Sequence, residues 1–153
     1  MASSNEPLFR GLEALGELLA ARDQSYACVV AGGASLAALG VIDRVTGDVD
    51  VMAAGLRAGM PPGLAERVTW RKYGGLHIGF VDRRALIALK LEAASDDPPH
   101  GRTDVHLGDL VSLAATADEL DEAAQWVNTV NVDPRRSETI AWVKSHVAES
   151  RSR

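Results

Sequence analysis

The sequence has one cysteine, no long apolar run and no excess of positive charge, and each of these shortages argues against a class of protein. A single cysteine, Cys28, cannot form an internal disulfide, so a disulfide-stabilised secreted domain is excluded and a cytoplasmic location is expected. No apolar run approaches the roughly 18 residues that span a bilayer, and the first residues lack signal-peptide features, so we expect no membrane association. The net charge of −5 argues against binding a long nucleic acid through the whole surface.

What is present is the composition of an ordinary globular protein. Of the 153 residues, 46% are hydrophobic and 24% are charged. This length and composition predict a single domain over residues 1–153. We expect an α/β (α+β) fold, with a small mixed sheet flanked by helices over about residues 24–95 and a helical part over about 103–150.

Local patterns predict the elements of this fold. Leucines at helical spacing after Asn5, a candidate N-cap, predict a first helix that ends near Arg22. The apolar run 26–31 predicts a buried strand, and Gly74-Gly75 predicts a hairpin turn. Further elements are a short helix over 34–39, strands over 48–52, 68–70 and 76–81, and helices that begin near Asp82, Asp104, Thr116 or Asp118, and Asp133.

Charge is spread unevenly along the chain. Residues 61–95 carry six bases and three acids, whereas residues 96–133 carry one base and nine acids. One interpretation is a pair of solvated faces. The other is that the basic segment helps to hold an anion.

The strongest chemical signal lies between residues 29 and 52. Two glycines after an apolar strand, Gly32 and Gly33, let the backbone approach a phosphate closely, and Ser35 can add a hydroxyl donor. Asp48 and Asp50, two residues apart on a strand, project to the same side and can share Mg²⁺, which prefers oxygen ligands. This segment therefore predicts a site where phosphates and carboxylates meet through metal.

Each half of this signal alone has an ordinary structural explanation, a tight turn or a solvated strand edge. Together they form a more specific pattern, because residues 44–51 read RVTGDVDV after the glycine pair. This pattern resembles the signature of the nucleotidyltransferase superfamily related to DNA polymerase β. It is most similar to the branch that contains AbiEii/MenT-type toxins and minimal nucleotidyltransferases.

A second stretch supports the resemblance. Residues 86–93 read LIALKLEA, residues 102–104 read RTD and residues 109–110 read DL, which is similar to a pattern of that branch. Thr103 stands where the branch pattern has lysine. The two stretches span about residues 29–113, more than half of the chain.

The resemblance implies a nucleotidyltransferase fold and specific residue roles. Gly32, Gly33 and Ser35 would bind the triphosphate of an NTP, while Asp48 and Asp50 would bind Mg²⁺. Arg44 could offset phosphate charge, and Lys90 and Asp104 match further active-site positions. The reaction would move an NMP to an RNA (tRNA), protein or small-molecule acceptor, in a toxin–antitoxin or defence system with a cognate toxin or antitoxin.

A third catalytic carboxylate is not evident in the sequence. Asp82 follows a predicted strand but is also placed to cap the next helix, and Asp104 stands at a predicted helix start. Without a third carboxylate, the chain would be a degenerate nucleotidyltransferase that acts as an antitoxin, partner or ligand sensor. A generic α/β domain with an incidental Asp-x-Asp is the remaining alternative.

Overall fold

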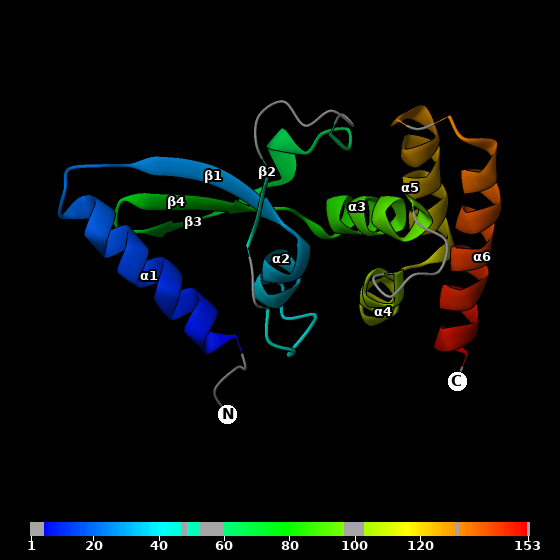
Figure 1. The fold of residues 1–153 in the computed structure, drawn as a ribbon, viewed down its shortest axis with the longest axis horizontal. Coiled ribbons are helices and arrows are strands. Elements are labelled where there is room, and N and C mark those ends of the chain that lie inside the picture. Colours follow the sequence, from blue (N-terminus) through cyan, green and yellow to red (C-terminus); the bar gives the residue numbers. More distant parts are fainter. Residues whose placement is uncertain (1–4, 47–48, 53–59, 97–102, 131, 153) are drawn as a thin grey trace. The chain divides into compact units, whose positions relative to one another are not determined.

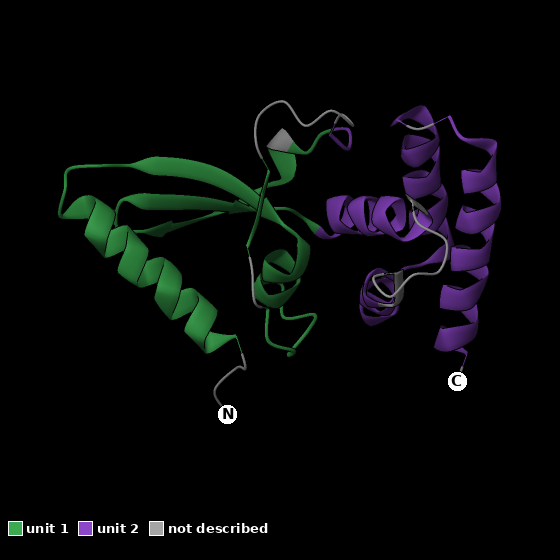
Figure 2. Ribbon diagram, viewed as in Figure 1, with its two compact units in different colours: residues 1–56, 63–82 green, residues 57–62, 83–153 purple. Residues whose placement is uncertain are grey.

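The computed structural model describes residues 5–46, 49–52, 60–96, 103–130 and 132–152 (Figure 1). The chain forms two compact units, unit 1 with residues 1–56 and 63–82 and unit 2 with residues 57–62 and 83–153 (Figure 2). The sheet belongs to unit 1 and the long helices after Asp82 belong to unit 2.

Unit 1 is built on a four-stranded mixed sheet, which confirms the predicted α/β class. The strand order is β2-β1-β4-β3, with β1 and β4 parallel and the two outer pairs antiparallel. Its elements are α1 (Glu6–Ala20), β1 (Tyr26–Ala31), α2 (Gly32–Ala38), β2 (Asp50–Met52), the 3₁₀ turn η1 (Ala65–Arg67), β3 (Thr69–Tyr73) and β4 (Leu76–Phe80).

The core of unit 1 lies where α1 packs on the sheet. Leu12 of α1 contacts a buried cluster of Val30 from β1 and Leu76, Ile78 and Phe80 from β4. The strand predicted over 26–31 has these bounds, but only its last two residues, Val30 and Ala31, are buried, whereas Tyr26 and Ala27 are exposed.

The start of α1 differs from the prediction. The Asn5 side chain makes no capping bond, and its Oδ1 instead accepts a hydrogen bond from the Thr46 backbone N–H at 3.2 Å. Asn5 is buried, so its side chain bonds across the fold to the loop before β2. The helix also ends at Ala20, two residues earlier than expected.

The described part of unit 2 contains four helices, with α3 at their centre. These are α3 (Arg83–Asp96), α4 (Thr103–Ser112), α5 (Ala117–Val130) and α6 (Pro134–Arg151). α3 packs against the other three, and its Leu86, Ile87 and Leu91 are almost completely buried. Of the two starts predicted for α5, Thr116 is the cap: its Oγ1 accepts from the Glu119 N–H. The cap predicted at Asp133 is confirmed, since its Oδ1 accepts from the Arg135 N–H.

None of the helices in the described part of the chain has the length and apolar character needed to cross a bilayer.

Candidate functional site

The glycine pair lies at the junction of β1 and α2. No turn separates the two elements, since α2 begins at Gly32, directly after the last residue of β1. Gly32 has a φ of +66°, a backbone conformation that residues other than glycine rarely adopt. A Cβ at Gly32 would also overlap Oδ2 of Asp50, so the Asp50 carboxylate packs directly against this glycine.

The sheet topology explains why Gly32 and Asp50 meet. β1 and β4 are parallel and therefore end at the same edge of the sheet, while β2 is antiparallel to β1 and begins there. Ala31 pairs with Asp50, and Val30 pairs with Phe80. Gly32, Asp50 and Asp82, which follows β4, consequently lie along one edge, the carboxyl end where ligands bind in many α/β sheets.

The loop before β2 packs on the start of α2. A Cβ at Gly33 would lie 2.7 Å from Thr46 Oγ1, and Thr46 is buried. Arg44 is exposed in the same loop. Asn5 and Thr46 thus fix the position of this loop, a contact between residues 41 positions apart that no local sequence pattern indicates.

Ser35 has a different environment from the expected phosphate contact. Its side chain is fully buried, and its hydroxyl donates a hydrogen bond to the Val30 carbonyl at 2.8 Å. The hydroxyl proton is therefore used to hold α2 against β1. Gly32 and Gly33 are partly exposed, so their backbone is the part of this segment that a ligand can reach.

Two of the predicted site residues cannot be placed as side chains. Asp48 lies outside the described residues. Asp104 lies in the first turn of α4, in unit 2, but its side chain is not among those described.

Lys90 lies in the interior of unit 2. Its Nζ is 2.7 Å from Oδ2 of Asp109 on α4, and both side chains are buried. A role for Lys90 at a nucleotide stays a prediction, because in this structure its ammonium pairs with Asp109. In the sequence Asp109 is only part of the DL pair at 109–110, and no local pattern indicates that its ion pair with Lys90 joins α3 to α4.

Asp82 is the carboxylate at the end of β4. Its Oδ2 lies 3.5 Å from Nε of Arg67, the last residue of η1, and both side chains are about one-quarter exposed. Within the described residues, no group of three or more carboxylate, imidazole or thiol side chains could hold a metal ion. Asp50 supplies the hard oxygen ligand that Mg²⁺ prefers, and Asp48 would have to supply the second.

The basic segment 61–95 does not form a free cationic surface. Three of its bases pair with acids of the segment 96–133, and Arg67 pairs with Asp82. Arg71 donates to the Ala38 carbonyl and lies over the rings of Phe9 and Phe80. The three cross-segment pairs are Arg83 with Glu119, Arg84 with Glu122 and Lys90 with Asp109. Four of the six bases of segment 61–95 are thus held in ion pairs, which removes most of the support for the anion-holding interpretation.

A scan against protein-family models gave no match to the chain, and searches of curated proteins and of solved structures gave none either.

Proposed function

We propose that the chain has a nucleotidyltransferase fold and transfers an NMP from an NTP, with Mg²⁺, to an RNA, protein or small-molecule acceptor. One observation carries this proposal: the Asp50 carboxylate packs against Gly32 at the edge where β1 and β4 end. The glycine backbone that would approach a phosphate and the exposed carboxylate that would bind Mg²⁺ belong to residues that are in contact.

Each residue at this edge has a defined task in the proposed reaction. The backbone of Gly32 and Gly33 would contact the triphosphate, since no described side chain caps the start of α2. Asp50, with Asp48, would hold Mg²⁺, which neutralises phosphate charge and stabilises the attacking and leaving oxygens. With the triphosphate held in this way, a nucleophilic group of the acceptor would attack the α-phosphorus in line. The nucleophile would lose its proton, and pyrophosphate would leave.

The remaining roles come from the resemblance alone. Arg44 is exposed and could reach a phosphate, while Lys90 and Asp104 keep the active-site roles of the toxin branch. A cognate toxin or antitoxin and a place in a defence system belong to the same proposal. Asp82 is a second candidate for the third carboxylate, because the parallel pairing of β1 and β4 brings it to the same edge.

The test is transfer of label from each [α-³²P]NTP, with Mg²⁺, to tRNA, total RNA or cell proteins. We expect labelling of one acceptor class and a loss of about 100-fold or more in Asp50→Asn, which keeps the shape but removes the charge. The matched control is Asp23→Asn in the turn before β1, at the opposite end of that strand, where asparagine tolerates the observed φ of +52°. Equal transfer by Asp50→Asn and the wild type would contradict the proposal.

A catalytically degenerate binding protein is the second candidate. The ion pair between Asp82 and Arg67 favours it, because Arg67 competes with a metal for the one carboxylate that follows β4. Calorimetry with NTP and Mg²⁺ separates the two. Metal-dependent binding that Asp50→Asn weakens, without label transfer, identifies the binder; absence of binding contradicts both candidates.

A further inference from the structure

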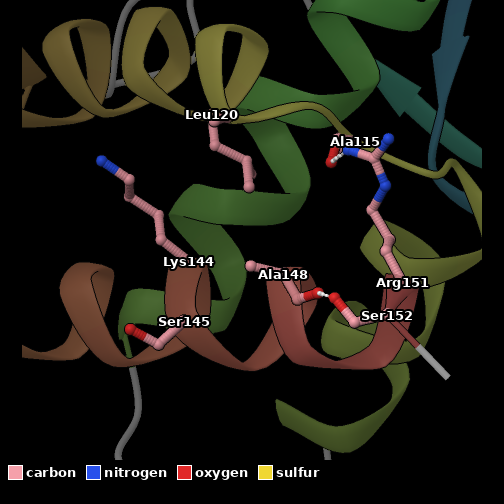
Figure 3. A pocket seen from close by; sticks show the side chains of 8 residues that line it. Ala115, Leu120, Lys144, Ser145, Ala148, Arg151 and Ser152 are labelled. Atoms are coloured by element: carbon pink, nitrogen blue, oxygen red, sulfur yellow. Dashed lines mark hydrogen bonds between the residues drawn. The ribbon is translucent and has the colours of Figure 1, made fainter.

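Unit 2 contains a pocket between the first turn of α5 and the last turns of α6 (Figure 3). Its volume is about 540 Å³, within the range of small-molecule sites. Ala115 and Leu120 are buried and form an apolar floor with Ala148. The hollow exists because the residues that meet here are mostly small, so an apolar group of moderate size can enter without displacing a side chain.

Two cations stand on either side of this floor. Figure 3 shows Lys144 and Arg151, seven residues apart on α6, flanking Leu120 and Ala148. Lys144 forms an ion pair with Asp121, which neutralises it. Arg151 is different: its Nη1 donates to the Ala115 carbonyl at 2.9 Å, and it forms no ion pair with any described residue.

The pocket therefore carries one oriented positive charge that no acidic side chain of the described residues pairs with. A guanidinium offers five N–H donors, of which the carbonyl of Ala115 occupies one. Ser145 also lines the pocket. An anion next to an apolar body matches these features, whereas a neutral apolar molecule would leave the charge of Arg151 unused.

We propose that this pocket binds a small organic anion, an apolar ring or chain that carries one carboxylate, sulfonate or phosphate group. The acidic group pairs with Arg151, and the apolar body lies on Ala115, Leu120 and Ala148. This site lies entirely within unit 2 and does not depend on the proposed nucleotidyltransferase reaction.

The test uses two fluorescent probes on the full chain. 1-Anilinonaphthalene-8-sulfonate has the aromatic body and the anion, and N-phenyl-1-naphthylamine has the same body without the anion. We expect saturable binding of the sulfonate with one site per chain, tighter than binding of the neutral probe and weakened by NaCl.

Variants localise the binding. Arg151→Gln should weaken binding of the sulfonate by about three- to tenfold and leave the affinity for the neutral probe unchanged. Ala148→Phe fills the hollow and should abolish binding of both probes. Arg135→Gln, in the first turn of the same helix, is the matched control and should change the affinity for neither probe. Circular dichroism confirms that each variant is folded. The proposal is overturned if Arg151→Gln and Arg135→Gln bind the sulfonate equally, or if Ala148→Phe binds both probes like the wild type.

Discussion

At the scale of single residues, the ion pair between Lys90 and Asp109 is the clearest case of a charge held inside the protein. Both side chains are buried, so each has lost most of its hydration, and the attraction between the two charges offsets part of that cost. Removal of Lys90 takes the paired positive charge away from a buried carboxylate, whereas removal of both side chains leaves an apolar space that hydrophobic side chains can fill.

We predict that Lys90→Met lowers the free energy of unfolding by about 3–5 kcal/mol, and that Lys90→Met with Asp109→Leu recovers most of this loss. Urea denaturation measures both. The control is Lys144→Met, whose partly exposed pair with Asp121 should contribute less than about 1 kcal/mol. Similar losses for Lys90→Met and Lys144→Met would show that the buried pair is not structurally important.

A second residue prediction concerns Gly32. Gly32→Ala places a Cβ against the Asp50 carboxylate and also forces alanine into an unfavourable backbone conformation. Gly40→Ala, at φ +70°, has only the conformational cost, because no atom lies within 4 Å of the added Cβ. We expect Gly40→Ala to cost about 1 kcal/mol and Gly32→Ala to cost clearly more in the same urea experiment. Adding Asp50→Ala to Gly32→Ala should remove most of the difference, and an unchanged difference would argue against the contact.

At the scale of elements, Glu119 at the start of α5 takes part both in the N-terminal cap of this helix and in an ion pair with Arg83. Glu119 accepts from the Thr116 backbone N–H at 2.9 Å while Thr116 Oγ1 accepts from the Glu119 N–H, a reciprocal capping box. Arg83 of α3 donates to both carboxylate oxygens of Glu119 at 2.8 and 3.0 Å. The hydrogen bonds from Arg83 and then from Thr116 lower the pKa of Glu119 from 4.5 to about 2.

This lowered pKa predicts a pH dependence of stability. Because Glu119 releases its proton more easily in the folded state, its contribution is complete above pH 4.5 and is lost as the pH falls toward 2. We expect about 1–2 kcal/mol, since Arg83 is partly exposed and water screens the pair. Thermal unfolding of Glu119→Gln between pH 2 and 6 should show a flatter profile than the wild type. A profile as steep as the wild type would assign the acid sensitivity to other carboxylates.

At the scale of the whole molecule, several acids of the segment 96–133 form ion pairs with bases of neighbouring helices inside unit 2. α3 supplies arginines to the acidic α5, through the pairs of Arg83 with Glu119 and Arg84 with Glu122, and Lys144 of α6 pairs with Asp121. All of these pairs are partly exposed, so dissolved salt can screen them.

We predict that 0.5 M NaCl lowers the free energy of unfolding by about 1 kcal/mol relative to 0.05 M. The double variant Arg84→Gln/Glu122→Gln should be less sensitive to salt, and Arg135→Gln/Glu138→Gln, two exposed residues of α6, serves as the control. An equal response of the wild type and the Arg84/Glu122 double variant would exclude this pair as a source of the salt effect.

Local chemistry in the sequence by itself determined several elements. The strand Tyr26–Ala31, the hairpin around Gly74-Gly75 and the helix starts at Thr116 and Asp133 follow from β-forming runs, turn glycines and capping side chains. Each of these depends on interactions within a few residues, which is why single-chain patterns predict them well.

Only the tertiary structure decided which polar side chains meet. Asn5 bonds to Thr46 instead of capping α1, Ser35 bonds to Val30, and Lys90 pairs with Asp109. A buried polar group must find a partner wherever the fold provides one, and sequence spacing does not show that place. The candidate site follows the same division: the sequence contains Gly32 and Asp50 in order, but the antiparallel pairing of β2 with β1 brings them into contact.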